Sequence, residues 1–254
     1  MNTSNVGWIG MGRMGAPMAE RLVKAGINLR IWNRTRSKAE PLEKIGASIV
    51  ESPADLSGVD ILATMVSTGS DVEAVYFGEN GVLSGSGVPK IFVDFSSIGV
   101  DQSANIRARL AQSDADLVCA PVSGNGKCVK AGKLSAVASG PKKAFDQVED
   151  IISTIAGRGV SYVGEGELAR FCKIAHNVML GAVTQNLAEI TVLAQKAGVP
   201  RRAFLDFMNN SVMGSIFTRY KTNAFVNLDW TTTFTPTLLR KDLDLGLAAG
   251  RELE

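Results

Sequence analysis

Short apolar runs alternate with longer segments of helical periodicity over the first two-thirds of the chain. Uninterrupted apolar runs are typical of strands in parallel sheets, because those strands are buried on both faces. We expect strands at residues 6–9, 29–32, 47–50, 61–66, 91–95, 116–120, 134–139 and 159–163. The segments between them predict helices at 14–25, 36–44, 70–77, 100–111 and 141–156. This alternation indicates an α/β fold, a mostly parallel sheet with helices on both faces.

The pattern changes after about Gly164. From Glu165 to Lys196 the chain has no proline and only two glycines, which predicts a single helix about 50 Å long. The apolar residues of this helix lie on almost all of its faces, so we expect other helices or a second subunit to enclose it. The sequence thus predicts an α/β domain at 1–164 and an all-helical domain at 165–254. Because the last helix stops without a capping signal, we expect the second domain to be incomplete.

Charge and cysteine content narrow the class of partner. The chain has 27 Lys and Arg against 25 Asp and Glu, without a block of like charge, so we expect neither a nucleic-acid nor a membrane partner. Three cysteines without a C-x-x-C pair, with a single histidine, do not make a zinc site. The N-terminus has no secretory signal and no apolar run is long enough to span a membrane. We expect a cytoplasmic protein with reduced thiols and a small-molecule partner.

The stretch "GWIGMGRMG" at residues 7–15 combines a strand, a glycine-rich turn and a helix start. In the dinucleotide-binding pattern of Rossmann-type folds, Gly10 would make the turn, Gly12 would let the backbone approach the pyrophosphate, and Gly15 would pack helix against strand. The helix N-terminus would favour the anion. The alternative is a glycine-rich turn without a ligand. The candidate cofactor residues of this turn are Gly10, Met11, Gly12, Arg13, Met14 and Gly15.

The end of the second strand predicts which nucleotide is preferred. An NAD enzyme usually has an acidic residue there, whereas this chain has Asn33, Arg34 and Thr35. Arg34 can pair with a 2′-phosphate, and its neighbours can add hydrogen bonds, so we expect NADP(H) to be preferred over NAD(H). The alternative is a solvated arginine on a basic edge. Further strand ends supply candidate cofactor residues: Met65, Val66, Ser67 and Ser97.

Two later segments suggest a catalytic site. Ser123 and Gly124, in "APVSGNGKC", make a loop suited to binding a carboxylate or another anion, although such residues also form ordinary exposed loops. Lys173 and Asn177 are four residues apart on the long helix and share one face, among apolar neighbours. Burial would lower the pKa of that lysine and suit it to proton exchange. Alternatively, its ammonium reaches solvent along an apolar surface.

Together these segments resemble the β-hydroxyacid dehydrogenase family, the 3-hydroxyisobutyrate dehydrogenase-like enzymes. The residues that carry the resemblance are "GWIGMGRMGAPM", "WNRT", "VDFSS", "APVSG", "GELARFCKIAHN" and "KDLDL", in the family's order. The "WNRT" form is most similar to the NADP-dependent branch that reduces glyoxylate and succinic semialdehyde. The resemblance implies hydride transfer between a nicotinamide and a small hydroxy acid or semialdehyde.

The resemblance also implies a role for individual residues. Lys173 corresponds to the general acid of reduction and general base of oxidation, and Asn177 to the residue that holds substrate or lysine in place. Ser123 and Gly124, with Asn125, correspond to the loop that binds the substrate's carboxylate. Ser97 corresponds to a position near the nicotinamide, and Lys241 to a lysine that reaches the cofactor. We give His176 no catalytic role and expect Asp242 to form an ion pair or cap.

Some residues depart from the family pattern and leave the substrate open. Cys119 stands where relatives commonly have an acidic residue, and Asn125 where they commonly have glycine, while Lys127 and Lys130 add charge beside the loop. An imine reductase, which usually lacks the helix lysine, and a non-catalytic nucleotide-binding scaffold are the alternatives. The apolar long helix favours a homo-oligomer, a homodimer or homotetramer.

Overall fold

The computed structural model describes residues 5–253. These residues divide into two compact units: the chain up to Ile174 together with the segment from Leu245 onward, and Ala175–Asp244 between them. Helices α7 (Leu168–Lys196) and α10 (Pro236–Glu252) each contribute to both units. The division into domains at residue 164 stays a prediction.

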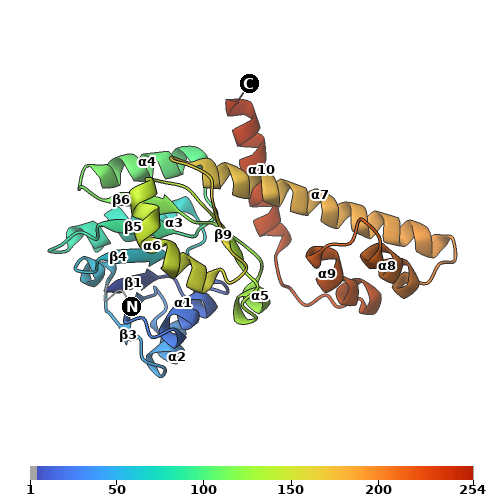
Figure 1. Cartoon of the computed structure of the whole chain (residues 1–254), viewed down its shortest axis with the longest axis horizontal. Coiled ribbons are helices and arrows are strands. Elements are labelled where there is room, and N and C mark those ends of the chain that lie inside the picture. Colours follow the sequence, from blue (N-terminus) through green and yellow to red (C-terminus); the bar gives the residue numbers. More distant parts are fainter. Residues whose placement is uncertain (1–4, 254) are drawn as a thin grey trace. The chain divides into compact units, whose positions relative to one another are not determined.

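The first unit contains a six-stranded parallel sheet (Figure 1). Its strands are β1 (Val6–Ile9), β2 (Leu29–Trp32), β3 (Ser48–Ile49), β4 (Ile61–Thr64), β5 (Ile91–Asp94) and β6 (Asp116–Cys119). They are arranged in the order β3-β2-β1-β4-β5-β6. The strand order reverses direction between β1 and β4, and ligands of such sheets bind outside the carboxyl ends of the strands at that point.

Helices cover both faces of this sheet, which confirms the predicted fold class. Helices α1 (Gly15–Lys24) and α6 (Lys142–Ile155) pack on one face, where Trp8 and Ile31 are fully buried. Helices α3 (Gly69–Phe77) and α4 (Val100–Ala111) pack on the other, against Leu62 and Phe92. Shorter helical segments are η1 (Arg36–Lys38), α2 (Glu40–Glu43), η2 (Pro53–Leu56) and η3 (Val82–Ser84).

A second, three-stranded sheet follows β6 and differs from the simple alternation that the sequence predicts. It consists of β7 (Val122–Ser123), β8 (Ser135–Ala138) and β9 (Val160–Tyr162), with β7 and β8 antiparallel. A single bridge between Cys119 and Ser139 connects it to β6. Strand β8 pairs with β7 and β9. The last two predicted strands, at 134–139 and 159–163, therefore do not extend the large sheet. The two-residue strand β7 is too short for the sequence pattern to predict.

The second unit is helical, as predicted. It contains most of α7, then α8 (Arg201–Asn210), α9 (Ile216–Asn227) and the first half of α10. Gly181 lies where α7 and α10 approach closely, because a Cβ there would come within 3.3 Å of Leu243. Met179 and Leu193 remain 68% and 69% exposed, so the described chain encloses α7 only in part. Among the described helices, none combines the length and apolarity needed to cross a bilayer.

The glycine turn after β1 gives a test of local packing. We expect Gly15→Ala to lower the free energy of unfolding by about 1–3 kcal/mol, because its methyl group would lie 2.1 Å from the carbonyl oxygen of Gly10. Gly12→Ala is the matched control and should change stability by less than about 0.5 kcal/mol, since no described atom lies within 4 Å of the added Cβ. Urea denaturation measures both, and equal losses would contradict this account.

Candidate dinucleotide and substrate site

The turn between β1 and α1 has the geometry that a dinucleotide requires. Gly10 has a φ of 102°, and a Cβ there would lie 2.1 Å from the carbonyl oxygen of Met65. Gly12, by contrast, has open space around its Cβ position among the described residues. No side chain of the described chain caps the start of α1. Gly12 therefore offers unobstructed backbone close to a helix N-terminus, where a pyrophosphate would be favoured.

Asn33 holds this turn from the end of β2. Its side-chain oxygen accepts a hydrogen bond from the backbone N–H of Met11 at 2.8 Å, and its side-chain nitrogen donates to the carbonyl of Thr35 at 2.8 Å. The asparagine thus links the glycine turn to the segment that the sequence assigns to the nucleotide's ribose. Its direct contact with a 2′-phosphate stays a prediction.

Arg34 and Arg36 follow at the same edge but differ in their partners. Arg34 is 87% exposed, and its guanidinium lies 3.9 Å from the carboxylate of Asp71. Arg36 pairs with Glu51 at 2.7 Å. A long, exposed ion pair is weak, so Arg34 can exchange Asp71 for a phosphate at little cost.

The carboxyl ends of β4 and β5 lie beside the glycine turn. The backbone N–H of Met65 donates to Ile9 at the end of β1, and that of Val66 donates to the hydroxyl of Ser96 at 3.0 Å. The Ser96 hydroxyl donates in turn to Asp94 at 2.7 Å. The predicted cofactor segments at 65–67 and 97 are therefore connected through a buried serine.

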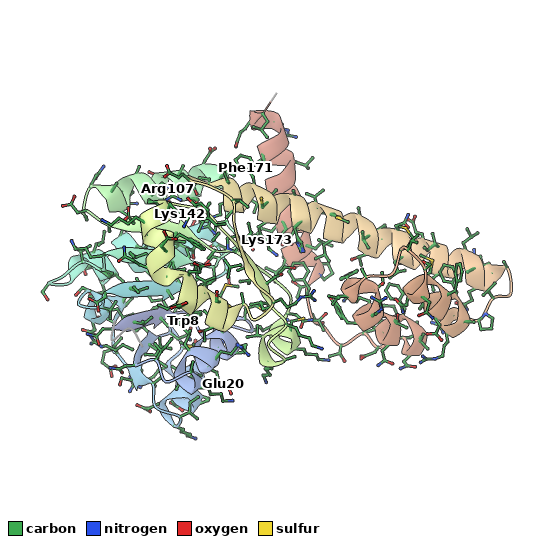
Figure 2. All side chains as sticks on the ribbon, in the orientation of Figure 1. Trp8, Glu20, Arg107, Lys142, Phe171 and Lys173 are labelled. Atoms are coloured by element: carbon green, nitrogen blue, oxygen red, sulfur yellow. The ribbon has the colours of Figure 1, made fainter. Side chains whose placement is uncertain are left out.

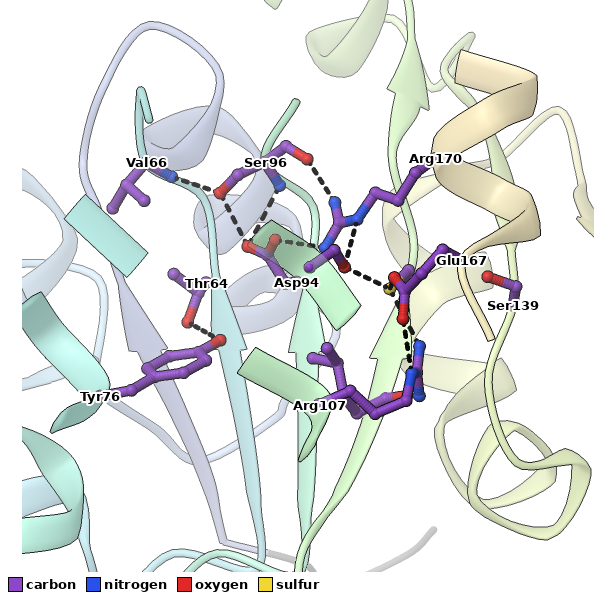
Figure 3. A network of polar contacts seen from close by, with 12 residues as sticks. Thr64, Val66, Tyr76, Asp94, Ser96, Arg107, Ser139, Glu167 and Arg170 are labelled. Atoms are coloured by element: carbon purple, nitrogen blue, oxygen red, sulfur yellow. Dashed lines mark hydrogen bonds and ion pairs between the residues drawn. The ribbon is translucent and has the colours of Figure 1, made fainter. Parts of the chain in front are cut away.

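A buried ion pair joins this strand end to helix α7 (Figure 3). Nη2 of Arg170 lies 2.6 Å from Oδ2 of Asp94, and both side chains are only 1% exposed. Arg170 also donates from Nη1 to the carbonyl of Ser96 at 2.5 Å and from Nε to the hydroxyl of Ser103 at 3.0 Å. Burial opposes the charge on Arg170, but the ion pair and hydrogen bond with Asp94 favour the charged form, and the pKa of Arg170 is raised. The guanidinium is thus charged and fixed at three points.

A second ion pair secures the residues just before α7. Arg107 on α4 contacts Glu167 at 2.6 Å and donates to the carbonyl of Gly166 at 2.8 Å. The Cys119 thiol donates to Glu167 at 3.3 Å, and burial raises the pKa of that thiol. Burial on its own would raise the pKa of Glu167, but hydrogen bonds, that from Arg107 foremost, outweigh it and lower this pKa. All three cysteines of the chain are free thiols.

Lys173 lies on α7 three residues after Arg170, and it is half-buried (Figure 2). The ion pair of Arg170 therefore anchors the turn of α7 that carries this lysine to the carboxyl end of β5. The proton-exchanging role of Lys173 stays a prediction.

The predicted substrate loop is partly strand and partly helix. Ser123 belongs to β7, and Gly124 adopts a φ of 131° where a Cβ would lie 2.8 Å from Leu134. The side-chain oxygen of Asn125 caps α5 (Gly126–Lys130) by accepting the N–H groups of Lys127 and Cys128 at 3.0 and 3.1 Å. A Cβ at Gly126 would be 3.1 Å from the carbonyl of Arg13, so this segment lies next to the glycine turn.

The second unit contains the remaining predicted residues. The side-chain nitrogen of Asn177 donates to Asp242 at 2.7 Å, and its oxygen lies 2.9 Å from Nδ1 of His176. Lys241 contacts Asp242 at 3.4 Å, which confirms the ion pair expected of that aspartate. Binding of substrate by Asn177 and of cofactor by Lys241 stays a prediction. Among the described residues, no cluster of His, Cys, Asp and Glu suits a metal ion.

Sequence reasoning missed the ion pair of Asp94 with Arg170 and the position of Ser96 between Val66 and Asp94. A signal was present in the sequence, an aspartate inside the apolar run "IFVDF". Burying an unpaired carboxylate destabilises the fold, so this aspartate requires a buried partner. The sequence did not show which cation would supply it, since Arg170 is 76 residues away along the chain.

Family comparisons agree with this geometry. Residues 5–164 match the NAD binding domain of 6-phosphogluconate dehydrogenase, and residues 167–254 match the NAD-binding region of NADP-dependent 3-hydroxyisobutyrate dehydrogenase. The chain belongs to the 3-hydroxyisobutyrate dehydrogenase-like family. It is an NAD(P)-binding oxidoreductase of this family, as the sequence resemblance implied.

Individual relatives are similar over nearly the whole chain. Glyoxylate/succinic semialdehyde reductase 2 of Arabidopsis thaliana is 29% identical over 97% of this chain and 69% of its own. 2-(Hydroxymethyl)glutarate dehydrogenase of Eubacterium barkeri is 30% identical over 97% of this chain and 82% of its own. The solved structure of Psf3 in complex with NADP+ and 2-OPP is 26% identical, with a TM-score of 0.88 over 96% of this chain and 86% of that one.

The lowered pKa of Glu167 makes part of the stability pH-dependent. A carboxyl whose pKa falls on folding contributes stability above its unfolded pKa of about 4.3 and loses it as the pH falls through the folded value. We therefore expect Glu167→Gln to destabilise the protein at about pH 6, and the difference from wild type to shrink toward pH 3. Urea unfolding across this range measures it.

Glu20→Gln is the control, because Glu20 pairs with Lys24 on the surface of α1. Its effect should be small at every pH. A Glu167→Gln effect that stays constant from pH 6 to about pH 3 would show that the carboxylate charge does not stabilise the fold.

Proposed function

We propose that this protein is an NADP-preferring oxidoreductase of small β-hydroxy acids or semialdehydes, with Lys173 as general acid in reduction and general base in oxidation. The observation that carries the proposal is the anchoring of the α7 turn next to Lys173, through Arg170, to the strand end that also holds the 65–67 segment. The same unit thus supplies a nucleotide turn and a half-buried lysine.

The residues present fit a nicotinamide dinucleotide. Gly10 and Gly15 have no room for a side chain, whereas the Cβ position of Gly12 is open, so the turn offers backbone to a phosphate. When bound, the nicotinamide exchanges a hydride with the carbonyl carbon of the substrate. The exposed Arg34 supports a preference for NADP, because a guanidinium binds a phosphate in a charge-assisted pair.

Lys173 would donate a proton to the substrate oxygen in reduction and accept it in oxidation. Negative charge develops on the substrate oxygen as the carbonyl is reduced, and an ammonium group stabilises this charge and can donate its proton to it. In the reverse direction the neutral amine accepts the hydroxyl proton. A lysine on a loosely held helix would do this poorly, since proton transfer requires hydrogen-bond distance.

The β7–α5 segment and the relatives support the proposed substrate class. Ser123 and Gly124 offer a hydroxyl and backbone that suit a carboxylate, and the names of two relatives refer to a semialdehyde and a hydroxy acid. The amide oxygen of Asn125 caps α5, and we propose that its amide nitrogen donates to the substrate. Lys127 and Lys130 add positive charge nearby and favour an anionic substrate.

We also propose a homodimer or homotetramer, because Met179 and Leu193 of α7 are largely exposed in the described chain. The cytoplasm remains the proposed compartment, because none of Cys119, Cys128 and Cys172 forms a disulfide in the described chain.

Replacing Lys173 tests the proposed chemistry. We expect Lys173→Ala to lower kcat by about 10²- to 10⁴-fold with little change in the Kd for NADPH, because the proton donor is lost and the glycine turn is not. Lys196→Ala, at the other end of the same helix, is the control and should retain wild-type kcat.

The assay is NADPH-dependent reduction of short semialdehydes, 2-oxo acids and cyclic imines. Turnover of imines alone would favour an imine reductase, and NADPH binding without any turnover would favour a nucleotide-binding scaffold. Normal kcat in Lys173→Ala would remove the assignment of this lysine.

Replacing Arg34 tests the nucleotide preference separately. We expect Arg34→Ala to weaken NADPH binding by about tenfold or more and to leave NADH binding nearly unchanged, because only NADPH carries the 2′-phosphate. Arg36→Ala is the matched control, since Arg36 is already paired with Glu51. Nicotinamide fluorescence titration measures both nucleotides. Equal weakening of NADPH and NADH would contradict a role in phosphate recognition.

A further inference from the structure

Arg170 contacts three different elements with its guanidinium. Nε donates to Ser103 on α4, Nη1 donates to the carbonyl of Ser96, and Nη2 pairs with Asp94 on β5. Figure 3 shows these contacts converging on one planar group. Because the geometry of a guanidinium is rigid, three separated partners fix its position and orientation.

These contacts restrain the part of α7 from which Arg170 projects. The side chain is 1% exposed, so it has no solvent-filled alternative position. A helix whose first turn carries such a residue resists both rotation and sliding, since either motion would break charge-assisted hydrogen bonds in a buried environment.

The restraint acts on both sides of the proposed reaction centre. Along α7, Lys173 follows Arg170 by three residues, about 4.5 Å of helical rise. Along the strand end, Ser97 follows Ser96, whose carbonyl accepts from Arg170 and whose hydroxyl accepts from Val66. One guanidinium therefore fixes the positions of two segments: the helix turn that carries the lysine, and the backbone next to the predicted nicotinamide segment.

We propose that Arg170 is a positioning residue for catalysis, which fixes the ammonium of Lys173 relative to the Ser96–Ser97 backbone. This inference rests on the proposed function of Lys173. Lysine cannot replace Arg170, because a single ammonium does not reach Ser103, Ser96 and Asp94 in their fixed arrangement. A displacement of about 1 Å is enough to lower a rate about 100-fold.

The test compares Arg170→Lys with Arg107→Lys. The two substitutions are chemically identical and affect neighbouring ion pairs, one buried and one partly buried, but Arg107 bonds Glu167, Gly166 and Leu117 rather than the Ser96 segment. We expect Arg170→Lys to lower kcat by about 10- to 100-fold. We expect the pH profile of kcat to shift only in Arg170→Lys, with the Kd for NADPH within about threefold of wild type. Arg107→Lys should lower the Tm but keep kcat within about threefold of wild type.

Combining Arg170→Lys with Lys173→Ala shows whether the arginine acts through the lysine. We expect the double variant to have the kcat of Lys173→Ala, because a missing ammonium cannot be misplaced. An equal fall in kcat in both backgrounds, or equal kcat values in Arg170→Lys and Arg107→Lys, would overturn the inference. If Lys173→Ala alone keeps normal kcat, the proposed function fails first, independently of the result at Arg170.

A milder variant covers the case in which Arg170→Lys does not fold. Ser103→Ala removes only the hydrogen bond to Nε of Arg170 from this set of three. We expect a fall in kcat of about threefold or more that disappears in the Lys173→Ala background. An unchanged kcat in Ser103→Ala would then count against the proposal.

Discussion

The ion pair between Asp94 and Arg170 is the interaction on which the rest of the first unit's site depends. Burying either charge alone would cost several kcal/mol, so neither side chain can leave its partner without destabilising the fold. In the neighbouring pair, the positive charge of Arg107 is balanced by the carboxylate of Glu167. Arg170 thus fixes α7 to the carboxyl end of β5, whereas Arg107 holds the residues just before α7 against α4 and β6.

The site uses the sheet's topology in the usual way for an open parallel sheet. The strand order reverses between β1 and β4, and the turn from Gly10 to Gly15 lies there, packed against Met65. Asn33 also fixes this turn to the end of β2. The proposed nucleotide site is therefore backbone held in place by side chains, and Arg34 lies at its exposed edge in a long ion pair with Asp71.

Membership of the 3-hydroxyisobutyrate dehydrogenase-like family gives this arrangement its chemical meaning. In the function proposed here the cofactor supplies the reducing equivalents, and the chain positions a nucleotide, an anionic substrate and a proton donor. Cys119 shows how the local charge balance is kept in this chain: its thiol is neutral and donates to Glu167, which carries the negative charge beside Arg107. The segment from Ser123 to Lys130 combines a strand with a capped helix, and it lies beside the glycine turn.

The sequence alone determined the features that depend on local pattern. Apolar runs and glycine spacing predicted the parallel sheet, the dinucleotide turn and the long helix, because strand burial, helix periodicity and tight turns leave their signature within a few residues. Only the tertiary structure decided that β8 and β9 form a separate sheet, that Asn33 holds the turn, and that Asp94 pairs with Arg170. Those contacts join residues far apart along the chain, and a buried charge shows in the sequence that it needs a partner but not which residue supplies it.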